Sequence, residues 1–220
     1  MVIRLSRLRA VNAYLVREDD GFTVIDTMLP GSERAIIGAA ERRGAPIRRI
    51  LLTHAHNDHV GSLDALAGAL REAEVLIGTR EARLLAGDMS LDPDEPQDKL
   101  RGGYPQVETR PTRTLEPGDR VGSLEVHAAP GHTPGQIALF DPRDGTLYCA
   151  DAYSTIGSVA TSAKADWRSP LPAVATWHKP TALESARRLR ELDPRGLAPG
   201  HGKVVEAPGA AMDRAIARGA

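Results

Sequence analysis

The strongest constraint on this chain is a cluster of metal-ligand side chains that directly follows an apolar segment. Residues 47–52 have the composition of a buried β-strand. Residues 53–61 then read Thr-His-Ala-His-Asn-Asp-His-Val-Gly. Imidazole nitrogens and carboxylate oxygens suit zinc, iron(II) and manganese, so the pattern predicts a strand that ends in a metal-binding loop. The ligand-type residues of this loop are His54, His56, Asp58 and His59.

A loop at a strand end can divide these side chains into two groups. His54 and His56 can point to one side while Asp58 and His59 turn to another, and each group then needs further ligands from elsewhere. A single histidine is more often a structural or surface residue, but five of the seven histidines follow expected β segments. Binding sites in α/β proteins gather at strand ends, so we expect one metal site built from several segments. The ligand-type residues after the other β segments are His132, Asp151 and His201.

Hydrophobic spacing alternates between β-type and helical segments in both halves of the chain, without an internal repeat. This alternation predicts an α/β layered protein with a single domain over residues 1–220. Thr181 and Glu184 have the spacing of a capping box at a helix start. Residues 88–111 and 152–180 are expected to be irregular. The expected strands cover 11–16 and 22–26 (a hairpin), 47–52, 75–77, 121–128, 136–141, 146–150 and 196–198, and the expected helices cover 32–43, 62–72, 80–86, 181–192 and 212–218.

Composition narrows the classes of partner and compartment. The chain has 28 Lys and Arg against 29 Asp and Glu, a net charge of −1, which argues against nucleic acid or an anionic membrane as partner. The single cysteine excludes an internal disulfide and a structural zinc site of four cysteines. With no signal peptide or membrane-spanning apolar run in the sequence, we expect a cytoplasmic protein. Cys149 is expected to be a small buried hydrophobe, His127 a structural residue, and His178 a structural or pocket residue.

The motif His-x-His-x-Asp-His, with a distant histidine, aspartate and histidine after it, closely resembles the metallo-β-lactamase-fold hydrolase superfamily. The resemblance extends from residues 12–15 and 24–27 to residues 199–202. It implies a four-layer αβ/βα sandwich of two mixed β-sheets flanked by helices, and it implies that Asp26 and Thr53 orient metal ligands. It also implies a ligand set: His54, His56 and His132 for a first metal, Asp58, His59 and His201 for a second, and Asp151 as a bridge between them.

The same resemblance implies an activity. Two divalent metal ions, expected to be zinc with iron or manganese as alternatives, would hold a hydroxide that attacks a small ester, lactone or thioester. Asp58 is the candidate to orient the water and shuttle its proton. Acyl-homoserine lactonases of this superfamily have a tyrosine shortly after the bridging aspartate, aimed at the substrate carbonyl. Tyr153 stands one residue closer to Asp151 than that pattern, so a packed aromatic is the alternative role.

Several other functions are weighed against this one. Glyoxalase-II-type thioesterases carry a helical domain after the last histidine ligand, and only residues 202–220 follow His201, so we rank that branch lower. A mononuclear iron dioxygenase of the same fold and a non-catalytic metal-binding protein stay open as alternatives. We expect a small-molecule substrate. Trp167 and Trp177, in the irregular segment 152–180, could line its pocket or anchor a homodimer contact.

Overall fold

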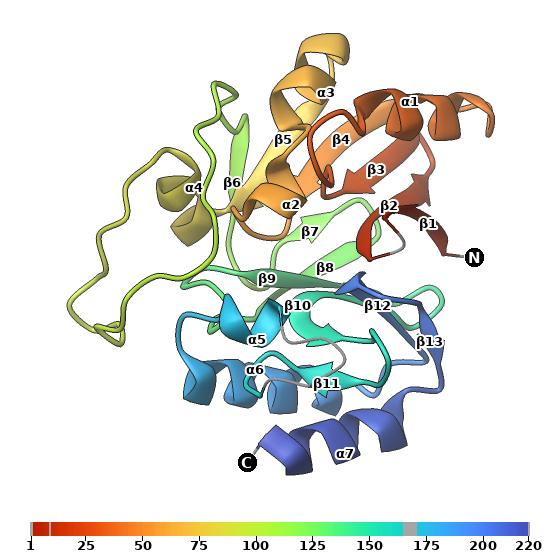
Figure 1. Cartoon of the computed structure of the whole chain (residues 1–220). Coiled ribbons are helices and arrows are strands. Elements are labelled where there is room, and N and C mark those ends of the chain that lie inside the picture. Colours follow the sequence, from red (N-terminus) through yellow and green to blue (C-terminus); the bar gives the residue numbers. More distant parts are fainter. Residues whose placement is uncertain (1, 9, 165–170, 220) are drawn as a thin grey trace. The chain divides into compact units, whose positions relative to one another are not determined.

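The computed structural model describes residues 2–8, 10–164 and 171–219, and the chain divides into two compact units (Figure 1). Unit 1 comprises Met1–Asp88 and Gly103–Leu115, and unit 2 comprises Met89–Gly102 and Glu116–Ala220. Each unit contains strands of a mixed sheet with helices packed on it. The predicted α/β class is therefore confirmed, while the single domain over the whole chain stays a prediction.

The sheet of unit 1 changes from antiparallel to parallel pairing along its strands. The order is β6-β5-β4-β3-β2, with β1 also paired to β2. β1, β2 and β3 pair antiparallel, as the predicted hairpin requires, and β3 to β6 pair parallel. β3 is buried along its whole length, and β4 is buried from Ile50 to Leu52, which is typical of strands covered on both faces. The strands are β1 Ile3–Arg7, β2 Val11–Glu18, β3 Gly21–Ile25, β4 Ile47–Leu52, β5 Glu74–Gly78 and β6 Arg113–Leu115.

The helices of unit 1 use short apolar faces to cover this sheet. α1 buries Ile36 and Ala39, α3 buries Leu63 and Leu66, and the two helices pack against one another. Figure 1 shows α1 and α3 together over the strands β3 to β5. The helices are α1 Glu33–Glu41, α2 Asn57–Val60, α3 Leu63–Ala69 and α4 Thr79–Leu85.

The sheet of unit 2 has the order β12-β10-β9-β8-β7, with β11 paired to β10 and β13 to β12. The single strand predicted over 121–128 is wrong, because Gly122, at φ +59°, turns the chain between Val121 and Leu124. A two-residue turn with positive φ matches the twist of a hairpin. The strands are β7 Arg120–Val121, β8 Leu124–Ala128, β9 Ile137–Asp141, β10 Thr146–Ser154, β11 Ala160–Thr161, β12 Gly196–His201 and β13 Val205–Glu206.

The segment 152–180 is more regular than its sequence suggests. The start of β10 pairs with β9, and the strand continues to Ser154 because its end pairs with β11 and β12; all of its residues are buried. Further along the segment come β11 and the short helix α5, Leu171–Val174. Residues 165–170, which include Trp167, lie outside the described residues, so the roles suggested for that tryptophan stay predictions.

The main helix of unit 2, α6 (Lys179–Glu191), begins earlier than predicted. Its N-cap is His178, whose Nδ1 accepts a hydrogen bond from the Thr181 backbone N–H at 3.3 Å, so the predicted capping box is wrong. Pro180 has no N–H that needs a partner and its φ suits the first turn, which allows the helix to start before Thr181. α6 packs against α7, Gly209–Gly219, over a core that contains Leu189 and Met212.

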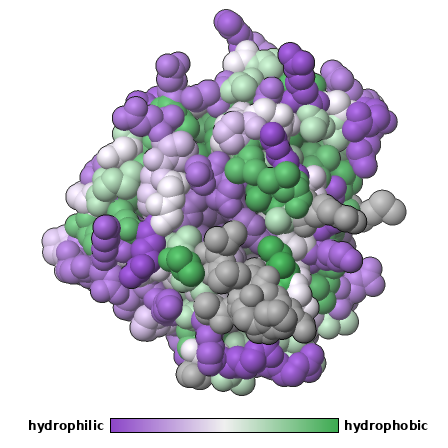
Figure 2. All heavy atoms as spheres, viewed as in Figure 1, coloured by the Kyte–Doolittle hydropathy of each residue, from purple (hydrophilic) through white to green (hydrophobic). Residues whose placement is uncertain are grey.

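None of the helices in the described part of the chain combines the length and apolar composition that crossing a bilayer requires. Figure 2 shows hydrophilic side chains over most of the visible rim. The large apolar side chains that are exposed among the described residues are Leu8, Met89 and Val174, and single exposed apolar side chains of this kind are normal.

His178→Ala should destabilise the protein, because the Thr181 N–H at the start of α6 loses its acceptor. The expected loss is about 1 kcal/mol of unfolding free energy, measured by denaturant unfolding. His178→Asn, which keeps a side-chain acceptor, is the matched control. Equal stability of the alanine variant and the parent would contradict the capping role.

Candidate metal centre

In unit 1, the strand-end loop after β4 gathers three imidazole rings. The ring centroids of His54 and His59 lie 4.0 Å apart, and those of His54 and His56 lie 4.9 Å apart. His56 is the N-cap of α2, and its carbonyl accepts from the His59 N–H at 2.9 Å. The three histidines are buried, whereas Asp58 in the first turn of α2 is partly exposed. The predicted loop of ligand-type side chains is thus present within this unit.

Asp26, directly after β3, forms hydrogen bonds with both ends of this loop. Its Oδ2 lies 2.7 Å from Nδ1 of His59, and its Oδ1 accepts from the Thr53 backbone N–H at 2.8 Å. Asp26 adopts φ +60°, a left-handed conformation that aspartate tolerates better than most residues. The carboxylate therefore orients His59 and the end of β4 together, which is the contact expected of Asp26.

The Thr53 hydroxyl determines which nitrogen of His54 carries a proton. Thr53 Oγ1 lies 2.8 Å from Asp26 Oδ2 and 3.1 Å from Nδ1 of His54. A hydroxyl has one hydrogen and an ionised carboxylate only accepts, so Thr53 donates to Asp26 and accepts from the His54 ring. The neutral ring then has its proton on Nδ1 and the lone pair for a metal on Nε2.

Two further supports of the loop were missed by the sequence analysis. Glu81 on α4 is fully buried, and its Oε2 accepts from the Ala55 N–H at 2.9 Å, between two candidate ligands. The ring of Tyr104 meets that of His56 edge-on at 4.8 Å. Burial, reinforced by the Glu81 carboxylate, raises the pKa of the Tyr104 phenol well above its usual range. The buried position of Glu81 could have been inferred from the sequence, because Glu81 lies on the same face of α4 as the buried Leu84.

In unit 2, His132 lies on a loop between β8 and β9 that is seated on the start of α6. Gly131 adopts φ +126°, and a Cβ there would lie 2.1 Å from the Ala182 backbone nitrogen. Only glycine fits this close approach. The carbonyl of Gly131 accepts from the His178 N–H at 2.9 Å, so α6 determines where His132 is presented.

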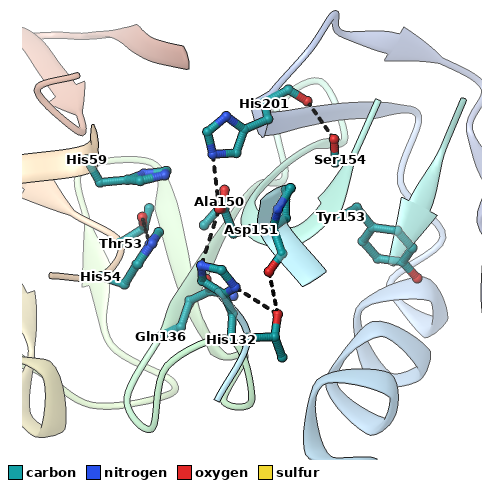
Figure 3. Close-up of polar contacts among 12 residues, drawn as sticks. Thr53, His54, His59, His132, Gln136, Ala150, Asp151, Tyr153, Ser154 and His201 are labelled. Atoms are coloured by element: carbon teal, nitrogen blue, oxygen red, sulfur yellow. Dashed lines mark hydrogen bonds and ion pairs between the residues drawn. The ribbon is translucent and has the colours of Figure 1, made fainter. Parts of the chain in front are cut away.

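Asp151 faces two histidines of the same unit. Its Oδ2 lies 3.3 Å from Nε2 of His132 and 3.1 Å from Nε2 of His201, at the end of β12 (Figure 3). The register between β10 and β12 shifts around Ala150, which has φ +46°. An irregularity of this kind redirects side chains and is common beside functional sites. The three side chains are buried, and imidazole and carboxylate groups are ligands suited to divalent metals.

Tyr153 does not face this donor set. Its side chain is fully buried in the core of unit 2, and its hydroxyl donates to the Ala186 carbonyl of α6 at 2.7 Å. Figure 3 shows the ring directed toward the helix and away from Asp151. Because the hydroxyl is engaged with a helix backbone inside the core, this placement favours the packed-aromatic alternative over the catalytic one.

Three other residues of unit 2 for which the sequence suggested possible roles are Cys149, His127 and Trp177. Cys149 lies in the hydrophobic core, as predicted, and burial together with the charge of Asp151 raises the pKa of its thiol. Burial also lowers the pKa of His127, which is partly exposed on β8. Trp177 is only 4% exposed, and its Nε1 donates to the Asp98 carbonyl at 2.9 Å. A buried indole offers little surface for a dimer contact.

The comparisons with known proteins agree with the motif. The model of the metallo-β-lactamase superfamily matches residues 6–201. The uncharacterized protein YobT of Bacillus subtilis is 47% identical over 94% of this chain and 89% of its own length. The probable metallo-hydrolase YflN of the same organism is 28% identical over 89% and 81%. A hydroxyacylglutathione hydrolase of Legionella pneumophila is 30% identical over 61% of this chain and 44% of its own length.

A solved structure supports the fold. The crystal structure of TTHA1623 in a di-iron-bound form superposes with a TM-score of 0.69 at 28% identity, over 96% of both chains. The fold implied by the motif is thereby confirmed, and divalent metals suit the histidine and aspartate side chains of both units. The chain belongs to the metallo-β-lactamase superfamily of metal-dependent hydrolases.

Proposed function

We propose that this protein is a dinuclear metal-dependent hydrolase of a small ester, lactone or thioester. The main observation behind this proposal is that three candidate histidine ligands have the same ring orientation, with Nδ1 next to an oxygen atom. Nδ1 of His54, His59 and His132 lies 3.1, 2.7 and 3.0 Å from an oxygen of the same unit. Metal-bound histidines characteristically engage their second nitrogen in this way, which leaves Nε2 as the ligand atom.

In the proposed ligand set, Asp151 would be a ligand of both divalent metals, and imidazoles would provide most of the other ligands. Zinc suits these ligands, and iron or manganese does as well. His54, His56 and His132 would hold a first metal, and Asp58, His59 and His201 would hold a second.

When bound, such metals supply Lewis-acid polarisation of the substrate carbonyl and activation of water at neutral pH. Asp58 is partly exposed on the first turn of α2, where its carboxylate can orient the water and take its proton. Returning that proton to the leaving oxygen or sulfur completes hydrolysis without a protein nucleophile. The buried Cys149, whose pKa burial raises, is unsuited to nucleophilic attack.

One observation bears on the class of substrate and another on the class of reaction. The net charge of −1 argues against nucleic acid or an anionic membrane as partner, because both need a concentrated positive field. The relatives named as a metallo-hydrolase and a hydroxyacylglutathione hydrolase support the reaction class. Which ester, lactone or thioester is used should be determined by a turnover screen over these bond types.

Metal-replete protein should carry about two transition-metal ions per chain, and chelation should abolish hydrolysis. Elemental analysis of dialysed protein and a turnover assay measure both. A single bound iron ion per chain at full occupancy, without hydrolysis of any ester, lactone or thioester tested, would contradict this proposal and favour the dioxygenase alternative. Two bound ions without turnover of any ester, lactone or thioester would support a non-catalytic metal-binding protein.

Asp58→Asn should reduce kcat by about 10²-fold or more, since the amide cannot take a proton. Asp64→Asn is the matched control, because Asp64 is an exposed carboxylate of α3 that accepts backbone N–H groups of Glu108 and Thr109. Near-normal turnover of Asp58→Asn with both metals bound would show that Asp58 does not carry the proton.

Tyr153→Phe should destabilise the protein by about 1 kcal/mol while leaving kcat unchanged, because it removes the buried hydrogen bond to Ala186. Unfolding and steady-state kinetics on the same preparation test both parts. A large fall in kcat with unchanged stability would return Tyr153 to the catalytic role.

A further inference from the structure

Thr176 connects the candidate ligand His132 to helix α5. Its side chain lies in the connection between α5 and α6 and is 1% exposed. Its Oγ1 lies 3.0 Å from Nδ1 of His132 and 2.6 Å from the carbonyl oxygen of Pro172 in α5. Both distances are within the range of hydrogen bonds.

The directions of these two hydrogen bonds follow from the atoms involved. A carbonyl oxygen only accepts, so the single hydroxyl hydrogen of Thr176 goes to Pro172. The hydroxyl oxygen must then accept from His132, which requires a hydrogen on Nδ1 of the ring. In a neutral ring the lone pair is consequently on Nε2, the atom that faces Asp151 at 3.3 Å.

The competing tautomer would be unsuitable for a metal. With its proton on Nε2, the neutral His132 ring could donate to the nearby Asp151 oxygen. Nε2 would then have no lone pair for a metal ion, and a proton would have to move before binding. An acceptor beside Nδ1 opposes this tautomer, and the Thr176 hydroxyl occupies that position.

The backbone around Thr176 keeps the contact in place. The Trp177 N–H donates to the His132 carbonyl at 3.0 Å, and the His178 N–H donates to the Gly131 carbonyl at 2.9 Å. The His132 loop therefore cannot move away from residues 176–178 without breaking both bonds. The hydroxyl and the ring are held together by the main chain and do not rely on their own bond alone.

We propose that Thr176 is a positioning residue that fixes the tautomer of His132 for metal binding. This rests on the proposed function in so far as His132 is a metal ligand. Thr53 has the same role for His54 in unit 1, with the Asp26 carboxylate in place of the Pro172 carbonyl. The two threonines lie in different parts of the sequence. In each case the hydroxyl donates its one hydrogen to an oxygen and can accept the hydrogen of a histidine Nδ1.

The test compares Thr176→Val, which removes the hydroxyl at nearly constant shape, with Thr176→Ser, which keeps it. Thr161→Val is the matched control, because Thr161 is a buried threonine of unit 2 outside this contact. Nitrogen-15 spectra of the histidine rings report which nitrogen carries hydrogen in metal-free protein. Competition with a chromophoric chelator gives the zinc dissociation constant, and thermal unfolding shows that each variant is folded.

In Thr176→Val, the His132 proton should shift from Nδ1 to Nε2 and zinc binding should weaken by about 10- to 100-fold. Thr176→Ser should restore both parent values, and Thr161→Val should change neither. An unchanged tautomer in folded Thr176→Val, or a serine variant that behaves like the valine variant, would overturn the proposal.

Different outcomes would contradict the proposed metal-dependent function and the positioning role of Thr176. If no variant or parent binds zinc, iron or manganese but the tautomer shifts as expected, Thr176 still fixes the ring and the proposed metal-dependent function is wrong. If all variants bind metal equally with one tautomer, the metal centre stands and the positioning role is wrong.

Discussion

The carboxylate of Asp26 joins parts of unit 1 that would otherwise be independent. The Asp26 backbone N–H donates to the Leu51 carbonyl at 2.9 Å, while the side chain engages Thr53 and His59. The ends of β3 and β4 and the start of α2 are thus joined at one buried group. Removing one partner from a buried charged network costs about 3–5 kcal/mol, so the fold and the ligand loop depend on the same contact.

The sequence was sufficient for most elements of the fold because their apolar patterns are local. The strand 47–52 is confirmed to the residue, and the helix expected over 32–43 is observed as Glu33–Glu41. Errors arose where tertiary pairing overrides local pattern. β10 extends to Ser154 because β11 and β12 pair with its end, and the local pattern of its own residues does not encode this pairing.

The candidate ligands could be predicted from their residue types, but the residues that position them could not. Imidazoles and carboxylates at strand ends are conspicuous in a sequence, whereas Glu81 and Thr176 are ordinary residues whose roles depend on a neighbour far along the chain. Tyr153 shows the opposite case. Its proximity to Asp151 in sequence suggested chemistry, because residues two apart in a regular strand point to the same face. The register of β10 against β12 shifts between Ala150 and Ser154, so that regular alternation does not hold at Tyr153.

Helix α6 has a consequence for thermal motion in unit 2. Gly131 packs against Ala182 in its first turns, and Tyr153 is bonded to Ala186 one turn later. The loop that carries His132 and the strand that carries Asp151 are thereby attached to one rigid rod. A displacement of α6 would therefore act on both attachments together, and the positions of His132 and Asp151 are coupled through one helix.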